Sequence, residues 1–198
     1  MTYEILSGLV LFAFVSSITP GPNNMMLMAS GANFGFRRTI PHMLGINLGF
    51  VFMCLVVGLG LAQVFAAYPV SYTVLRTFSV VYLLWLAWKI AHAAPVRKSD
   101  ATGQPMTLLQ AAAFQWINPK AWAMVLTAIS VYSPQQTVQM IVLVAAVFCA
   151  VNLPSISSWT VLGQQMARLL NSSRRLVIFN RTMAALLVLS LYPVLLPA

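Results

Sequence analysis

The chain has 198 residues, of which 60% are hydrophobic and only 7% are charged. Soluble domains are about 25% charged, and disordered chains are rich in charge and poor in apolar residues, so the composition excludes both classes. Because one membrane crossing takes about 20 apolar residues, the chain has room for about six or seven helices and for no separate soluble domain.

Apolar residues gather in six segments, and each is long enough to cross the hydrocarbon core of a bilayer. The segments lie at about 4–34, 40–66, 71–92, 107–131, 137–162 and 175–195. Uniform hydrophobicity over about 20 residues indicates a helix, since a membrane strand is shorter and alternates. The sequence therefore predicts an all-α polytopic membrane protein with six transmembrane helices, in which residues 1–198 form a single transmembrane domain.

The positive charges predict how the helices are oriented. The net charge is +9, and eight Lys and Arg residues lie in or beside the loops that follow the first, third and fifth segments. These eight are Arg37, Arg38, Lys89, Arg97, Lys98, Arg168, Arg174 and Arg175. Since such residues mark cytoplasmic helix ends, we expect these loops inside and both termini outside. The cations are spread thinly, so no nucleic-acid partner is expected.

A polar stretch at 94–106 is predicted to be a cytoplasmic linker between two halves, 1–93 and 107–198. Each half holds three apolar segments. Because three is odd, the second half must run through the membrane opposite to the first. This is the arrangement of a 3+3 inverted-topology repeat.

The first segment is interrupted by the sequence Thr19-Pro20-Gly21-Pro22-Asn23-Asn24. Proline lacks an N–H and its ring clashes with the carbonyl four residues earlier. The carbonyls of Ser16 and Ile18 should therefore lose their helical partners, and a new helix should begin at Pro22. Such a break inside a membrane must be satisfied internally or must line a polar cavity.

The fourth segment, the first of its half, is interrupted in the same way around Gln115 and Asn118-Pro119-Lys120. Lys120 lies about 13 residues into that segment, where a cation is costly and usually functional. The only acids, Glu4 and Asp100, lie near the aqueous faces. Lys120 therefore meets a carboxylate brought by a substrate, faces water, or is kept neutral by desolvation, which would make it a proton carrier.

The two breaks together predict a binding site for a zwitterion. A helix start carries partial positive charge and free N–H groups, which suit a carboxylate. Freed carbonyls and Asn side chains suit an ammonium group. Because the site has no acid to balance a cationic side chain, small neutral amino acids fit it better than lysine or arginine.

Two further polar groups are candidates for this site or for its coupling to protons. Asn47 lies between Gly45 and Gly49, whose GxxxG spacing permits close helix approach, and Asn152 is its partial counterpart in the fifth segment. His42, at the start of the second segment, titrates in a useful range and joins Lys120 as a proton-coupling candidate. A solvated interface histidine is the alternative. The glycine faces are also compatible with a homodimer.

The sequence leaves two other functions open. Cys54 and Cys149 lie at roughly equivalent places in the two halves, as a membrane thiol redox carrier would need. A thioether cluster at 25–28 would suit a metal or inorganic-ion exporter. No resident metal and no cofactor are expected. The chain has no HExxH, GxSxG or Walker motif, and two acids and two histidines are a poor basis for an enzyme.

These motifs resemble those of the LysE/RhtB superfamily of bacterial amino-acid exporters. The resemblance covers nearly the whole chain in the expected order. It rests on the sequence at 19–24, on Gly45 and Gly49, on the run at 82–89 (YLLWLAWK) and on the sequence at 118–120. It implies a six-helix protein of the bacterial inner membrane that exports amino acids or close derivatives, such as cysteine, threonine or homoserine, by alternating access driven by the proton gradient.

The fifth segment looks closest to the branch that exports cysteine and its acetylated precursor, through Asn152-Leu153-Pro154-Ser155. Many members of the superfamily carry an acid in the fifth helix, where this chain has Asn152. A simple carboxylate route for protons is therefore not expected here.

Overall fold

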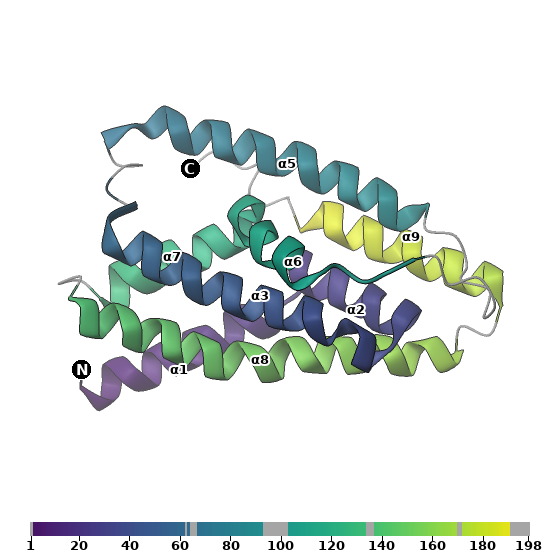
Figure 1. The fold of residues 1–198 in the computed structure, drawn as a ribbon, viewed down its shortest axis with the longest axis horizontal. Helices are drawn as coiled ribbons and strands as arrows, with labels where there is room; N and C mark the ends of the chain where they lie inside the picture. Colours follow the sequence, from purple (N-terminus) through teal and green to yellow (C-terminus); the bar gives the residue numbers. More distant parts are fainter. Residues whose placement is uncertain are drawn as a thin grey trace.

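The computed structural model describes residues 2–61, 63, 67–92, 103–133, 137–169 and 172–190, which form helices and turns without a strand (Figure 1). The helices are α1 (Tyr3–Ile18), α2 (Pro22–Phe34), α3 (Phe36–Val56) with the π-helical turn η1 (Val57–Leu61), α5 (Pro69–Ala91), α6 (Leu108–Phe114) with the 3-10 turn η2 (Gln115–Ile117), α7 (Pro119–Tyr132), α8 (Val138–Leu169) and α9 (Ser173–Leu189). Residues 94–102 of the expected linker and 191–195 of the sixth segment lie outside the described residues.

All six apolar segments contain helices, so the all-α prediction is confirmed for the described residues. Two segments are divided: the first into α1 and α2, which meet at a bend of 53°, and the fourth into α6 with η2 and α7. By length and composition, three described helices can cross a membrane, namely Phe36–Leu61, Thr73–Ala91 and Val138–Met166, with the bent pair α1 and α2 as a fourth. The count of six spans and the inverted repeat stay predictions.

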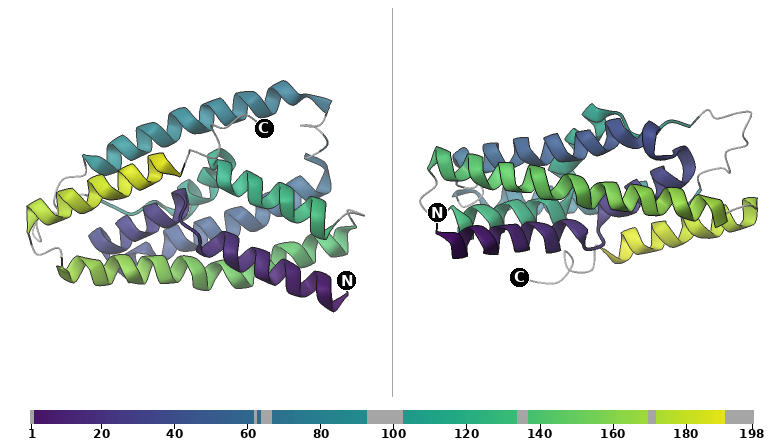
Figure 2. Two further views of the ribbon diagram at one scale, coloured as in Figure 1. Left: turned by 180° about the vertical axis from the view of Figure 1, so that it is seen from behind. Right: turned by 90° about the horizontal axis from the view of Figure 1, so that it is seen from below.

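The outer faces of the helices are apolar. Leu11 of α1, Phe52 of α3 and Val74 and Phe78 of α5 are exposed, as are many other large apolar side chains. A soluble monomer rarely exposes so much contiguous apolar surface, so this surface suits contact with lipid. α5 and α9 lie side by side along one edge of the molecule (Figures 1 and 2).

α8 organises the rest of the fold, since it packs against α1, α2 and α3. Its crossing with α2 is made at backbone distance. A Cβ on Gly163 would overlap the carbonyl group of Met28, and a Cβ on Gly31 would overlap the carbonyl group of Thr160. The second segment makes a similar contact, because a Cβ on Gly49 would lie 2.6 Å from the Cα of Ala112 in α6. Small residues at such crossings let membrane helices approach closely.

A large apolar cluster fills the space between α1, α3, α7 and α8. Its members include Leu9, Phe50, Trp122 and Phe148, all fully or almost fully buried. This cluster lies directly beside the two helix breaks, since Phe50 also lines the pocket described below.

Candidate functional site

The first break occurs where the prolines predict it. α1 ends at Ile18, Thr19 is its C-cap in an extended conformation, and α2 begins at Pro22. Gly21 is the N-cap of α2 and has an extended backbone, and no side chain of the described residues makes a capping hydrogen bond at this helix start. The start of α2 therefore presents N–H groups that no capping side chain takes up.

The carbonyls freed by this break are bonded inside the protein. The Ser16 carbonyl accepts from the Thr19 hydroxyl at 3.1 Å, and the Ile18 carbonyl accepts from the indole N–H of Trp159 in α8 at 3.1 Å. Both carbonyls were expected to lose helical partners. The protein replaces those partners with side-chain donors, as a break inside an apolar bundle requires.

Asn24 supports the same break from the α2 side. Its buried Nδ2 donates to the carbonyls of Ser17 and Thr19, at 2.8 Å each. One amide thereby ties the first turn of α2 to the last turn of α1, which fixes the geometry of the bend.

The second break has a different cap. Asn118 precedes Pro119, its N–H donates to the Gln115 carbonyl at 3.3 Å, and its Oδ1 accepts from the Lys120 N–H at 3.1 Å. The helix start predicted at Pro119 is therefore present, and its first free N–H is partly satisfied by the cap.

The two breaks are joined directly by side chains. Asn23 Nδ2 donates to Gln115 Oε1 at 2.8 Å, and Gln115 Nε2 donates back to Asn23 Oδ1 at 3.2 Å. Gln115 is fully buried, and its Nε2 also donates to the Ala111 carbonyl at 2.9 Å. Residues 92 positions apart in the sequence thus form one amide pair between the first and fourth segments.

Lys120 joins the breaks a second time. Its Nζ donates to the Thr19 carbonyl at 2.7 Å, to the Thr19 hydroxyl at 3.0 Å and to the Pro20 carbonyl at 3.4 Å. Of the two acids, Glu4 lies at the exposed start of α1 and Asp100 lies outside the described residues. The contacts found for the Lys120 ammonium are therefore neutral oxygens at the C-terminal end of α1, where the helix dipole is negative.

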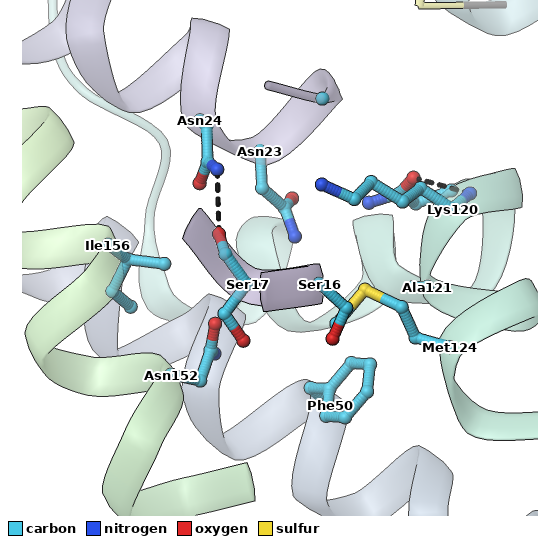
Figure 3. A pocket seen from close by; sticks show the side chains of 12 residues that line it. Ser16, Ser17, Asn23, Asn24, Phe50, Lys120, Ala121, Met124, Asn152 and Ile156 are labelled. Atoms are coloured by element: carbon cyan, nitrogen blue, oxygen red, sulfur yellow. Dashed lines mark hydrogen bonds between the residues drawn. The ribbon is translucent and has the colours of Figure 1, made fainter. Parts of the chain in front are cut away.

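These side chains surround a pocket with about 340 Å³ of empty space, its open mouth included (Figure 3). The pocket is lined by Ser16, Ser17, Gly21, Asn23, Asn24, Phe50, Asn118, Lys120, Ala121, Met124, Asn152 and Ile156. In Figure 3, Asn24 and Asn152 lie on opposite sides of Ser17, with Lys120 beyond Asn23. Polar amides, one ammonium and apolar walls thus share one small space.

Asn47 lies behind this pocket and supports it. Asn152 Nδ2 donates to Asn47 Oδ1 at 3.0 Å, and Asn47 Nδ2 donates to the carbonyl and the sulfur of Cys149 at 3.2 and 3.3 Å. The counterparts in the second and fifth segments therefore contact each other, and only Asn152 lines the pocket.

The structure brings the predicted site residues together. Gly21, Asn23, Asn24, Asn118, Lys120 and Asn152 line the pocket. Thr19, Pro20, Asn47 and Gln115 bond to those residues, and Pro22 and Pro119 begin the two helices.

Sequence reasoning missed the remaining lining residues. Ser16 and Ser17 lie within one turn before the break, so a polar pair there was a usable signal. Phe50, Met124 and Ile156 are apolar residues within apolar runs, and nothing in the sequence distinguished them.

His42 does not lie in the solvated surroundings that the sequence left open. It is only 2% exposed, and neither ring nitrogen has a hydrogen-bond partner among the described residues. It lies on the buried face of α3, near Thr39 and Ile46 by helical spacing, and it does not line the pocket.

The methionines and cysteines are the residues on which a metal exporter or a thiol redox carrier would depend. Met25 and Met28 pack with Phe179, whereas Met26 belongs to a different cluster, so the thioethers do not share one cluster. Both cysteines are free thiols.

Comparison with known proteins decides the family. The sequence profile of LysE type translocators matches residues 14–191, which include both breaks and every residue of the pocket. This chain belongs to the LysE family. Members of the family are transporters and integral membrane proteins, in agreement with the apolar helices described above.

The relatives of this LysE-family chain include the cysteine/O-acetylserine efflux proteins of Escherichia coli (strain K12) and Shigella sonnei (strain Ss046). Each is 28% identical over 193 residues, which cover 95% of this chain and 96% of the relative. The resemblance to the cysteine/O-acetylserine branch is confirmed at that level of identity. No solved structure gives a significant match.

Proposed function

We propose that this protein exports small neutral amino acids or close derivatives from the bacterial cytoplasm by alternating access driven by the proton gradient. The observation that carries the proposal is the meeting of two broken helices at one pocket, with the half-buried side chain of Lys120 between them. The names of the relatives make cysteine and O-acetylserine the first substrates to test, with threonine and homoserine next.

The pocket offers partners for both ends of an amino acid. The Lys120 ammonium and the N–H groups at the starts of α2 and α7 suit the carboxylate. The carbonyls freed at the end of α1 suit the ammonium group, with the side-chain oxygens of Asn23, Asn24 and Asn152 in the same pocket. Since Asn152 is neutral, a cationic substrate side chain would find no counter-charge, and that favours small neutral substrates.

An inverted repeat would explain how this site works in a transport cycle. The proposed topology has six spans, with both termini outside. In such a repeat α2 and α7 would be equivalent helices of the two halves, and each begins with a proline directly after a break. The two halves would then rock about the site, with the pocket opening to one side at a time. The direct contact between Asn47 and Asn152 supports an axis near these residues.

Proton coupling is assigned to Lys120 and His42. Lys120 is the titratable group in the pocket, so a change in its charge acts directly on a bound carboxylate. His42 is buried and has no hydrogen-bond partner within the described part of the chain, so a proton taken up there would need a new partner or a shift of α3. Both groups would then link protonation to helix position.

The test is a substrate panel in living bacteria. Cells are supplied with dipeptides, and every amino acid that leaves them is quantified for wild type, Lys120→Ala and the control Lys89→Ala. Lys89 lies over the ring of Trp85 at 4.8 Å and away from the pocket. We expect selective efflux of one or a few neutral amino acids, lost in Lys120→Ala and kept in Lys89→Ala.

Two outcomes would overturn the proposal. Efflux of no amino acid above the empty-vector control, with the protein verified in the membrane, would reject the substrate class. Wild-type efflux in Lys120→Ala would reject the role of the lysine.

A further inference from the structure

We infer that Lys120 is a resident substitute for the substrate's ammonium group: in the empty carrier its side chain fills the ammonium subsite, and substrate binding exchanges one ammonium for the other. The inference rests on the proposed function for its second half only. Its first half, that the end of α1 is a subsite for primary ammonium ions, can be tested without any transport.

The subsite is a cradle of three neutral oxygens at the end of α1: the carbonyls of Thr19 and Pro20 and the hydroxyl of Thr19. The Lys120 Nζ lies 2.7, 3.4 and 3.0 Å from them, so the three acceptors match the three N–H donors of a primary ammonium. The negative end of the α1 dipole adds to the attraction. Nothing in this set distinguishes a lysine ammonium from the ammonium of a free amino acid.

The carbonyls of the cradle are available because of the helix break. Thr19 is the C-cap of α1, and Pro20 and Gly21 follow it outside any helix, so these carbonyls have few backbone donors within reach. Among the described residues, the amide of Asn24 also donates to the Thr19 carbonyl, at 2.8 Å. A cation that leaves the cradle therefore leaves strong acceptors behind, and a second ammonium can replace it.

The Lys120 side chain passes close to the backbone of Gly21 before it reaches the cradle. Its stem crosses directly over Gly21, where a Cβ would lie 2.5 Å from Lys120 Cδ and 3.1 Å from Nζ. Gly21 has an extended backbone that any residue can adopt, so the reason for glycine here is the close approach of the lysine. The path runs from the start of α7 to the end of α1 and lies along the pocket wall.

Charge balance explains why exchange is favourable. The described part of the site has no carboxylate, so adding a zwitterion while Lys120 stays in the cradle leaves the incoming ammonium without a cradle of its own. If that ammonium takes the cradle, Lys120 is released beside the substrate carboxylate and forms an ion pair with it. Each charge then has a partner, and an unpartnered charge in a membrane interior costs several kcal/mol.

Exchange also sets a requirement on the substrate. An amine without a carboxylate would release Lys120 into the pocket with no anion to receive it. A carboxylate without an amine would draw Lys120 out and leave the cradle empty. The ligand must therefore carry both groups, within the length of one small amino acid.

The first experiment tests the cradle in purified protein. Lys120→Ala and Lys120→Met both remove the resident ammonium, and Met keeps most of the stem volume in case Ala does not fold. Ethylammonium chloride is the probe, and tetramethylammonium chloride, which has no N–H donor, is its control. At about ten times its Kd, ethylammonium should raise the unfolding midpoint of either variant by about 3–6 °C, and that of wild type by less.

The matched variant is Thr19→Val added to Lys120→Met, because it removes one of the three acceptors and keeps the shape. This double variant should lose most of the ethylammonium shift. Equal shifts with ethylammonium and tetramethylammonium, or equal shifts in wild type and both Lys120 variants, would overturn the cradle.

The second experiment tests the exchange. In the Lys120→Met protein, the amino acid that wild type exports should compete with ethylammonium, while its N-acetyl derivative should not. If ethylammonium binds the cradle but the protein exports no amino acid, the proposed function is wrong and the ammonium subsite still stands. Amino-acid efflux without any specific ethylammonium shift would sink the subsite and keep the proposed function.

Discussion

Asn23 and Gln115 exchange two hydrogen bonds between the two helix breaks, at 2.8 and 3.2 Å. Asn23 directly follows Pro22, Gln115 lies four residues before Pro119, and the two residues belong to different halves of the chain. Two amides that satisfy each other form a neutral connection, which holds the breaks together without adding charge. The pocket therefore keeps its shape when the lysine beside it moves.

This pair should be measurable in a double-mutant cycle. Asn23→Ala leaves the fully buried Gln115 Oε1 without its donor, and the free energy of unfolding should fall by about 1–3 kcal/mol. Gln115→Leu should cost a similar amount. The double variant should cost less than the sum, with a coupling of about 0.5–3 kcal/mol. Denaturation in one detergent measures all four proteins, and strict additivity would contradict the pairing.

Gly21→Ala should abolish efflux without unfolding the protein. The new methyl group meets the Lys120 stem at 2.5 Å, and a flexible lysine yields by leaving its path. Gly8→Ala is the control, because its Cβ would lie at an ordinary 3.4 Å from Tyr132. Efflux from cells and the unfolding midpoint are measured for both. Normal efflux in Gly21→Ala would mean that Lys120 does not need this position.

The same close approach predicts a rescue of stability. The overlap with Lys120 is the steric part of any loss of stability in Gly21→Ala, so adding Lys120→Ala should remove that part. Because Gly21 is the N-cap of α2 and alanine is a poorer N-cap than glycine, the unfolding midpoint of the double variant should lie only slightly below that of Lys120→Ala alone. An equal cost of Gly21→Ala with and without the lysine would show that the methyl group does not meet it.

Asn152→Asp should shift the substrates toward cationic amino acids. Asn152 lines the same pocket as Lys120, and an acid there supplies the counter-charge that the wild-type site lacks. It also removes the N–H that Asn47 Oδ1 accepts, so total efflux should fall. The ratio of lysine to threonine efflux is the measurement, with Asn152→Leu as the uncharged control. An unchanged ratio in Asn152→Asp would place residue 152 outside the region that contacts the substrate side chain.

The breaks themselves could be predicted from the sequence, because proline has a fixed local effect. Pro22 and Pro119 begin helices in the structure as expected. The partners of the freed carbonyls could not be predicted. Trp159 reaches the Ile18 carbonyl from 141 residues away, and only the packing of α8 against the end of α1 brings them together.

The same limit applies to Lys120 and His42. The depth of Lys120 in an apolar segment showed that it needed a partner, and the absence of nearby acids suggested a substrate carboxylate. The structure provides backbone oxygens at Thr19 and Pro20. The sequence predicted free carbonyls at this break that suit an ammonium group, but not that Lys120 reaches them. His42 is buried by the elements packed around α3, and position along a segment says nothing about neighbouring helices.

Helix ends were less predictable than helix existence. α8 continues to Leu169, past the expected end at 162, through the polar residues Gln164 and Gln165. Glutamine is a good helix former, so polarity ends an apolar segment without ending its helix. Gln164 then caps another element, since its Oε1 accepts from the Phe36 N–H at 2.7 Å.

The thiols should be dispensable for efflux. Cys149 accepts a hydrogen bond from Asn47 through its sulfur, and a serine hydroxyl can accept the same bond. Cys54 lies in the apolar cluster, where alanine is tolerated at the cost of a small cavity. A Cys54→Ala, Cys149→Ser protein should export at near the wild-type rate. Loss of efflux with normal insertion would instead favour a thiol redox carrier.

Gly163→Ala should harm the fold itself. Its methyl group would overlap the Met28 carbonyl. That carbonyl is backbone and cannot move away, unlike the flexible Lys120 side chain beside Gly21. The expected loss is about 1–3 kcal/mol. In Gly103→Ala the new Cβ meets only the ring of Phe34, at 3.3 Å, so this control should stay close to wild type in unfolding midpoint. Equal stability of the two variants would contradict the close crossing.

That crossing also has a mechanical meaning. Helices separated by a layer of side chains can slip past one another as the side chains change rotamer, but α2 and α8 touch backbone to backbone at Gly31 and Gly163 and have no such layer. Because α2 belongs to the first half of the chain and α8 to the second, this crossing would act as a pivot if the halves rock against each other. α3 and α7 meet through a cluster of large apolar side chains that includes Met53 and Val125, and a contact of that kind can adjust during such a movement.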